Sequence, residues 1–326
     1  MGQAGPAITP SRTTDNPAHA PLPALPQLAA FVARTQSFTS PDSSFKGWRD
    51  SYNRMCRAFT PPRPSGLQVS DLQLAGVPAR AYCPTSPTPA DGWPCLLYLH
   101  GGGWVVGDLD SHDFITAYLA AQLQVLVVAV NYRLAPEHPF PAAFDDCLAA
   151  WRALQAGASP FALDARRQLV IGDSAGGNLT AALCLALRDA GEPLPAAQVL
   201  LYPGLGGAAD LPSRSQCADA PLLGSNDLDA YQALYLPGPN QHSPYARPLL
   251  ATDFSGQPAA FIALAQFDPL RDDGALYHQR LLAAGGHSQL YPGLGLVHGC
   301  LRARGLAPEV DALYGALLDY LRGCLE

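Results

Sequence analysis

One short run of residues carries the strongest chemical signal in this sequence, the G-x-S-x-G pattern GDSAG at 172–176. It lies between an apolar stretch typical of a buried strand, QLVIG (168–172), and a helical stretch, NLTAALCLALRDAG (178–191). A serine on such a strand–turn–helix connection exposes its hydroxyl above the sheet, and the following helix directs N–H groups toward it. We therefore predict that Ser174 is a nucleophile; the alternative is a glycine-rich turn with an incidental serine.

A serine hydroxyl is a weak nucleophile, so it needs a base, and the base needs a group that orients it. Four histidines follow the serine in the chain: His242, His278, His287 and His298. The first falls in a long insertion, the second inside a helical stretch, and the third before the predicted strand SQLYPG (288–293). His298 follows that strand, and ligands in open α/β sheets bind beyond the carboxyl ends of strands. Position therefore predicts His298 as the base, with a purely structural histidine as the alternative.

The orienting acid should also follow a strand. Asp268 does so, directly after the apolar stretch AAFIALAQ (259–266). A carboxylate there would hold the imidazole in the required tautomer and stabilise the imidazolium that forms. The next two aspartates, Asp272 and Asp273, are expected to cap a helix that begins at Gly274. The alternative for Asp268 is a residue that only forms the turn before the following proline.

Acyl transfer also needs donors for the oxyanion that develops on the carbonyl oxygen. The run HGGGW (100–104) follows the apolar stretch CLLYLH, and successive glycines let backbone N–H groups converge on one oxygen. We expect these donors to be the N–H groups of Gly101, Gly102, Gly103 and Ala175. His100 is expected to shape this loop and not to act as a second base.

The elements that must position these residues alternate between apolar strands and helices. Continuous apolar runs predict buried strands, and this alternation predicts a mostly parallel sheet with helices on both faces. The strands are expected at 95–100, 125–132, 168–172, 197–203, 259–266 and 288–293, with a hairpin at 67–84. Two helices are expected at 25–36 and 42–59, after a loose leader over residues 1–26. The stretch 204–258 looks irregular and is too long for an ordinary loop, which favours a functional segment such as a lid.

Composition narrows the class of partner. The net charge of −7 argues against non-specific nucleic-acid binding, which needs a basic face. We find no run of about 18 apolar residues and no secretory signal pattern, so we expect a cytoplasmic protein without stable membrane insertion.

The eight cysteines lack framework spacing and are expected to be free thiols. Metal and phosphate-loop motifs are missing from the sequence, so we expect no metal and no cofactor.

Five segments together resemble one known family: HGGGW (100–104), NYRLAPEHPFPAAFDD (131–146), GDSAGG (172–177), DPLRDDG (268–274) and the late HG (298–299). In order and spacing they are similar to the bacterial hormone-sensitive-lipase-like esterases, the HGGG/GDSAGG branch of the α/β-hydrolases. The resemblance covers about residues 66–323. It implies an α/β-hydrolase fold over a single domain, 1–326, with a mostly parallel central sheet flanked by helices and a helical cap.

The resemblance also implies roles for particular residues. Ser174, Asp268 and His298 would be nucleophile, acid and base, and the oxyanion donors would be chiefly Gly102 and Gly103, together with Ala175. Arg133 and Glu137 would make internal ion pairs. The cap would be built from about 1–50 and 204–250. Relatives often pair through the last sheet strand, so the resemblance also implies a homodimer. Cys300 departs from the phenylalanine common after His-Gly in this family.

The expected activity is a serine carboxylesterase that hydrolyses small-molecule esters of short- to medium-chain acids through an acyl-enzyme. Two alternatives stay open. The same machinery serves an amidase or deacetylase, and the same fold can serve as a non-catalytic receptor for a small ligand. The presence of all three predicted catalytic side chains favours an enzyme over a receptor.

Overall fold

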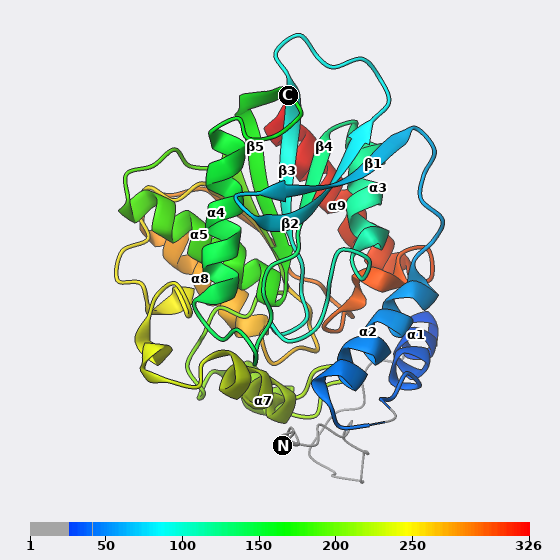
Figure 1. Cartoon of the computed structure of the whole chain (residues 1–326). Helices are drawn as coiled ribbons and strands as arrows, with labels where there is room; N and C mark the ends of the chain where they lie inside the picture. The colour runs from blue at the N-terminus through cyan, green and yellow to red at the C-terminus, as the bar shows by residue number, and fades with distance from the viewer. Residues whose placement is uncertain (1–25, 41) are drawn as a thin grey trace.

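The computed structural model describes residues 26–40 and 42–326, and its core is one eight-stranded sheet (Figure 1). The strands are β1 (Leu67–Leu74), β2 (Val77–Pro84), β3 (Trp93–Leu99), β4 (Leu126–Val130), β5 (Leu163–Asp173), β6 (Ala197–Leu201), β7 (Ala259–Ala263) and β8 (Ser288–Tyr291). Their spatial order is β1-β2-β4-β3-β5-β6-β7-β8. The β1–β2 and β2–β4 pairs are antiparallel and all others are parallel. The predicted sheet and hairpin are confirmed, while the expected leader falls outside the described residues up to position 25.

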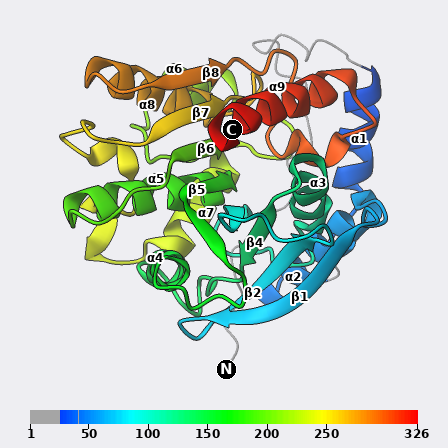
Figure 2. The same cartoon turned by 90° about the horizontal axis from the view of Figure 1, so that it is seen from above.

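Helices cover both faces of this sheet. They are α1 (Pro26–Gln36), α2 (Phe45–Phe59), α3 (Asp113–Leu123), α4 (Ala142–Gln155), α5 (Ala175–Asp189), α6 (Pro212–Gln216), α7 (Ser225–Tyr235), α8 (Arg271–Ala283) and α9 (Pro308–Leu325). Helices α3 and α9 lie on one face, and α4, α5 and α8 lie on the other (Figure 2). Strands β3, β4 and β6 are buried along their whole length because both of their faces are covered. This explains why they read as mainly apolar runs in the sequence.

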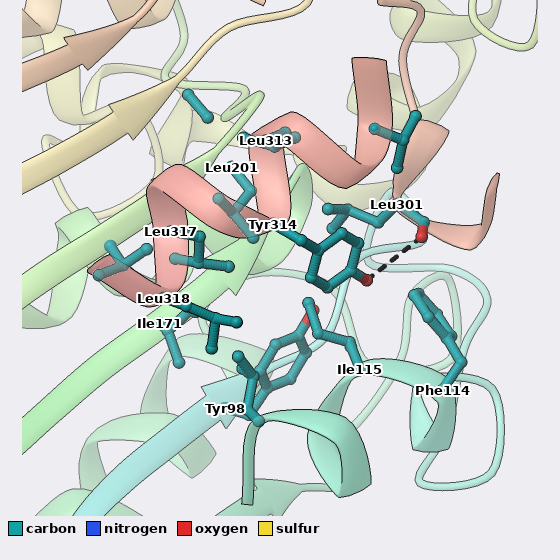
Figure 3. Packing of buried hydrophobic residues seen from close by; sticks show 14 of the residues in the cluster. Tyr98, Phe114, Ile115, Ile171, Leu201, Leu301, Leu313, Tyr314, Leu317 and Leu318 are labelled. Atoms are coloured by element: carbon teal, nitrogen blue, oxygen red, sulfur yellow. Dashed lines mark hydrogen bonds between the residues drawn. The ribbon is translucent and has the colours of Figure 1, made fainter. Parts of the chain in front are cut away.

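Helix α9 illustrates how sequence period becomes packing. Its buried residues recur every three or four positions, as a helix with one apolar face requires: Val310, Leu313, Tyr314, Leu317 and Leu321. Figure 3 shows this face packed over strand residues Ile171 and Leu201. Removing such a set of side chains from water is the main favourable contribution to folding. The helix is thereby fixed across the sheet, and its tyrosine hydroxyl donates to the Leu301 carbonyl over 3.2 Å.

The stretch 204–258 differs from the expectation. It was predicted to be irregular, but it contains α6, α7 and two short 3-10 helices, η1 (Pro239–His242) and η2 (Pro248–Leu250). These helices are difficult to predict because they are short and show too few apolar repeats. The proline and glycine residues around them are also more typical of loops. Several other element boundaries also differ from the expected ones; for example, β5 begins at Leu163, α5 at Ala175 and α8 at Arg271. Within the described ranges, no helix is long and apolar enough to cross a bilayer.

Candidate active site

Ser174 lies at the turn between β5 and α5 and has a backbone conformation that side chains rarely adopt, φ 54° and ψ −116°. Its amide donates to the Leu201 carbonyl over 2.8 Å, which fixes the turn on the neighbouring strand. The flanking glycines are required by close packing: a Cβ on Gly172 would lie 2.7 Å from the Leu99 carbonyl oxygen, and one on Gly176 only 1.8 Å from it. The strain at the serine is therefore held by the tight contact between strand and helix.

Asp268 and His298 follow β7 and β8, where an isolated parallel bridge between Phe267 and Val297 continues the pairing of the two strands. This bridge sets the next residue of each chain segment side by side. The Asp268 carboxylate lies 2.7 Å from His298 Nδ1, and Nε2 of the same ring lies 2.9 Å from Ser174 Oγ. Because a carboxylate only accepts hydrogen bonds, Nδ1 carries the proton and Nε2 is left to accept from the serine hydroxyl. The structure thus joins these three side chains in one hydrogen-bonded series.

Asp268, the acid of this series, is fully buried, with 0 % of its surface exposed. Its second oxygen accepts a hydrogen bond from the Leu270 amide over 2.8 Å, so the carboxylate is fixed at both oxygens. His298 is 8 % exposed, and its imidazole lies against the Tyr202 ring, with 4.8 Å between ring centroids. These contacts leave Nε2 as the imidazole atom directed at the serine.

The glycine loop after β3 supplies fewer free donors than expected. Gly102 and Gly103 have φ angles of 119° and 58°, and both line the same cavity as Ser174 and Ala175. The amide of Gly101, however, donates to the Asp173 carboxylate over 3.0 Å. The expectation that Gly101 is an oxyanion donor is therefore wrong, because its N–H is already used inside the fold.

Asp173 is a buried carboxylate that the sequence analysis did not single out. Besides the glycine amide, it accepts a hydrogen bond from the Tyr98 hydroxyl over 2.8 Å, and His112 Nε2 lies 3.4 Å away. Burial by itself would raise the pKa of Asp173, but His112, Tyr98 and Arg302 outweigh it and hold the pKa at about 2. An acid placed between an apolar strand and the nucleophile is the signal that could have indicated such a network.

His100 lies behind the glycine loop and does not line the cavity. Its ring stacks on Tyr132 with 4.1 Å between centroids, and Nδ1 lies 2.8 Å from the Gly101 carbonyl oxygen. Burial, reinforced by the neighbouring His112, lowers the pKa of His100 to about 4. The side chain is a neutral support for the loop, in agreement with the prediction that it shapes this segment.

The cavity above the serine has a volume of about 100 Å³. Since a cavity needs roughly 10–15 Å³ to hold one water, this space is enough for several waters or a short organic group. Its walls come from α2, the glycine loop, the 204–258 stretch and the segments after β7 and β8. Apolar and aromatic side chains make up much of these walls: Tyr52, Leu222, Leu223, Leu228, Tyr231 and Leu270. Arg302 also lines the cavity, and no local sequence pattern indicated it.

The remaining predicted polar residues serve the fold. Asp272 and Asp273 do not cap a helix at Gly274, because α8 already begins at Arg271 and both aspartates lie in its first turn. Asp272 accepts from the Ser213 amide over 2.8 Å instead.

The expected internal ion pairs are present. Arg133 lies 2.8 Å from Asp146, and Glu137 lies 2.6 Å from Arg49. Each pair joins the segment after β4 to a helix, since Asp146 lies in α4 and Arg49 lies in α2. Neither Arg133 nor Glu137 lines the cavity above Ser174.

The other candidate histidines lie away from the serine. His278 Nδ1 lies 2.8 Å from the Ser288 hydroxyl, His242 ends η1, and His287 precedes β8. Across residues 26–40 and 42–326, no group of three or more His, Cys, Asp or Glu is arranged to hold a metal ion. All eight cysteines are free, and seven of them are buried.

Comparisons with known proteins agree with this architecture. A family model for the alpha/beta hydrolase fold matches residues 96–302. The carboxylesterase NlhH of Mycobacterium tuberculosis is 41% identical over 257 residues, which is 78% of this chain and 80% of that protein. Ethyl acetate hydrolase of Pseudomonas putida is 38% identical over 250 residues, 74% of this chain and 79% of that protein. A crystal structure of an esterase from the bacterial hormone-sensitive lipase family superposes with a TM-score of 0.81 at 30% identity, covering 92% and 99% of the two chains.

Proposed function

We propose that this chain, which belongs to the hormone-sensitive-lipase-like esterase family of the α/β-hydrolase fold and is a carboxylic ester hydrolase, works through an acyl-enzyme on Ser174. The observation that carries the proposal is the pair of contacts made by His298, 2.9 Å to the serine hydroxyl and 2.7 Å to Asp268. A general base must lie within about 2.6–3.2 Å of the proton that it removes, and this imidazole does.

In the first half of the reaction, His298 Nε2 takes the hydroxyl proton of Ser174 while the serine oxygen bonds to the ester carbonyl carbon. The carbonyl oxygen becomes an oxyanion, which the N–H groups of Gly102, Gly103 and Ala175 stabilise. As the intermediate collapses, the bond between the carbonyl carbon and the alcohol oxygen breaks. The imidazolium then gives its proton to the departing alcohol, and the acyl group stays on the serine.

In the second half, water attacks the acyl carbon and His298 removes a proton from it. The bond to Ser174 breaks, the serine oxygen recovers its proton from the imidazolium, and the carboxylic acid leaves. In both halves, the role of Asp268 is to hold the ring and to stabilise the positive charge that forms on it.

The substrates that we propose are esters of short- to medium-chain acids. The cavity volume of about 100 Å³ supports this limit, and so does its apolar wall. The name of the Pseudomonas putida relative, ethyl acetate hydrolase, points to the same size of substrate. We propose that the cap over this cavity comes from the expected 204–250 segment and from α2 at the end of the expected 1–50 segment, since Leu228 and Tyr231 in α7 and Tyr52 in α2 line it. Residues 1–25 of the expected cap lie outside the described residues.

Two finer features complete the proposal. A homodimer would form through β8, which is the last strand in the order of the sheet and presents a free edge within the described part of the chain. A reducing compartment, the cytoplasm, would suit a protein with eight free thiols. Analytical ultracentrifugation of the purified chain would test the dimer.

The decisive experiment measures the hydrolysis of p-nitrophenyl esters from C2 to C12 by the wild type and by Ser174→Ala. Loss of the nucleophile should lower kcat by about 10⁴-fold or more, and turnover should peak among the shorter acyl chains. Ser86→Ala, which removes an exposed hydroxyl far from the cavity, is the matched control. Near wild-type turnover by Ser174→Ala would refute the proposal.

Two further measurements separate the remaining alternatives. A fluorophosphonate probe should label the wild type and not Ser174→Ala, whereas a receptor with an inert serine would stay unlabelled. Values of kcat/KM on a matched ester and anilide would distinguish an esterase from an amidase or deacetylase that uses the same side chains.

A further inference from the structure

Arg302 is a buried cation in the wall of the active-site cavity. It lies in the short 3-10 helix η3 (Cys300–Ala303), four residues after His298, and it is 8 % exposed. The helix is held by the hydrogen bond from Tyr314 to the Leu301 carbonyl (Figure 3), so the guanidinium is carried on a fixed segment. Arg302 and Ser174 line the same space, so a molecule bound at the serine lies within reach of this charge.

The guanidinium has very few partners for a buried group. Nη1 donates to the Tyr52 hydroxyl at a long 3.4 Å, and Cζ lies 5.6 Å from the centre of that ring. Nε has no hydrogen-bond partner. Throughout the described chain, no carboxylate forms an ion pair with Arg302. An arginine offers five donors, so most of its hydrogen-bonding capacity is unused.

Other buried arginines of this protein show the contrast. Arg214, with 10% of its side chain exposed, makes a 2.5 Å ion pair with Asp273. Arg80, with 14% exposed, makes 2.6 Å ion pairs with Asp71 and Asp110. A buried charge is costly unless it is paired, so an unpaired one in a ligand cavity indicates that the partner comes with the ligand.

Asp173 is the acid whose charge acts on Arg302, but it does so without contact. One oxygen of its carboxylate, Oδ1, accepts hydrogen bonds from both the Tyr98 hydroxyl and the Gly101 amide. A purely structural role, in which the two charges balance each other at a distance, is therefore the competing explanation. It makes no prediction about substrate charge, and this difference allows a test.

We propose that Arg302 binds an ionised carboxylate carried by the substrate, so that the preferred substrates are esters whose acid or alcohol part bears a second carboxylate. The planar guanidinium matches a carboxylate with two parallel hydrogen bonds, and Nε and Nη2, which lie on one edge of the guanidinium, can donate them. The inference rests on the proposed ester hydrolysis at Ser174 and adds to it the charge of the preferred substrate.

The experiment compares two matched pairs of esters by acid release in a pH-stat. On the acid side, monoethyl adipate is compared with ethyl hexanoate; on the alcohol side, 4-acetoxybutanoate is compared with butyl acetate. In the wild type, at least one charged ester should exceed its neutral counterpart in kcat/KM by about tenfold or more, mainly through KM. The side on which the preference occurs tells which part of the substrate faces Arg302.

Variants then assign the preference to the guanidinium. Arg302→Met should lower the charged-to-neutral ratio of kcat/KM by about ten- to a hundredfold, and Arg302→Lys should lower it less, because it keeps a charge without the planar fork. Arg304→Met is the matched control: Arg304 lies two residues on, over the Tyr118 ring at 3.8 Å, and should leave the ratio unchanged. Circular dichroism melting of each variant checks folding, and the lysine variant tests the inference if the methionine variant does not fold.

The inference is overturned if neither charged ester is preferred, or if the ratio is the same in wild type and in the Arg302 variants. Such a result leaves the ester hydrolysis at Ser174 intact as long as Ser174→Ala is inactive on ethyl hexanoate. Hydrolysis of ethyl hexanoate that persists in Ser174→Ala contradicts the proposed function itself, so the two failures are distinguishable.

Discussion

The amide of Gly101 donates a hydrogen bond to the carboxylate of Asp173 across 3.0 Å, and this contact ties the glycine loop after β3 to the residue before Ser174. The Tyr98 hydroxyl reaches the same carboxylate oxygen over 2.8 Å. Two of the proposed oxyanion donors, Gly102 and Gly103, follow β3, whereas the nucleophile follows β5, so their relative position depends on such a connection. Asp173 is thus a positioning residue: it holds the loop beside the nucleophile and takes no part in the bonds that form or break in the proposed reaction.

We expect Asp173→Ala to lower kcat by about a hundredfold with a smaller change in KM, because misplacement of reacting groups by about 1 Å costs that much. Asp173→Asn keeps an oxygen that accepts from Gly101 and Tyr98, so it should recover part of the lost kcat. Steady-state kinetics on p-nitrophenyl butyrate measure both. A purely structural role would instead lower the melting temperature and leave the kcat of the folded fraction within about threefold of the wild type.

The sequence predicted the parts of the site that depend on position along strands. Ser174, Asp268 and His298 each follow an apolar run, and the carboxyl ends of parallel strands meet at one edge of a sheet. This rule predicts that the three residues lie close together, although Ser174 and His298 are 124 residues apart in the sequence. It needs no knowledge of side-chain packing. The same reasoning found the sheet and most of its helices.

The parts that the sequence did not predict depend on contacts between distant segments. Tyr52 and Arg302 are 250 residues apart and face the same cavity only after α2 docks against η3. Whether the Gly101 amide is free or already bonded depends on the carboxylate of Asp173, whose direction no local pattern specifies. Helix α7 was missed because its sequence, SNDLDAYQALY, buries only Leu228 and Tyr235 and so lacks a strong apolar period.

Gly102 allows a second prediction, on the oxyanion donors. Its φ is 119°, and a Cβ at this position would lie 2.1 Å from the Val106 carbonyl oxygen, so the backbone of the loop must shift in Gly102→Ala. Displacing one oxyanion donor lowers kcat by about 10²–10³-fold. The matched control is Gly76→Ala, since Gly76 has a similar φ of 82° in the β1–β2 turn but no atom within 4 Å of the added Cβ. Equal losses of kcat in both variants would contradict a role for the loop in catalysis.

His100 leads to a prediction about pH and stability. Burial, reinforced by His112, lowers its folded-state pKa to about 4, while the unfolded chain keeps the ordinary value of about 6.5. Between these values the unfolded state binds more protons, so acidification must favour unfolding. From pH 7 to pH 5 this histidine should remove about 2 kcal/mol from the free energy of unfolding.

Guanidinium chloride unfolding at the two pH values measures this loss in the wild type and in His100→Gln. Glutamine can still donate to the Gly101 carbonyl but does not titrate, so the variant should lose less stability on acidification, whatever its stability at pH 7. Parallel losses in the two proteins would show that the group responsible lies elsewhere.

The last prediction concerns the attachment of the 204–258 stretch to the body of the fold. Asp273 in α8 is 0 % exposed and accepts from the amides of Leu205 and Gly207 over 2.9 and 3.2 Å, while Arg214 in α6 pairs with it at 2.5 Å. Burial raises the pKa of Asp273, which means that its charge depends on these partners.

Arg214→Met removes the cation and leaves a buried carboxylate, and we expect it to lower the free energy of unfolding by about 3–5 kcal/mol. Adding Asp273→Asn in the same chain removes the orphaned charge, so the double variant should be more stable than Arg214→Met alone. Guanidinium chloride unfolding at pH 7 measures both, and a single variant as stable as the wild type would mean that the ion pair does not hold this stretch in place.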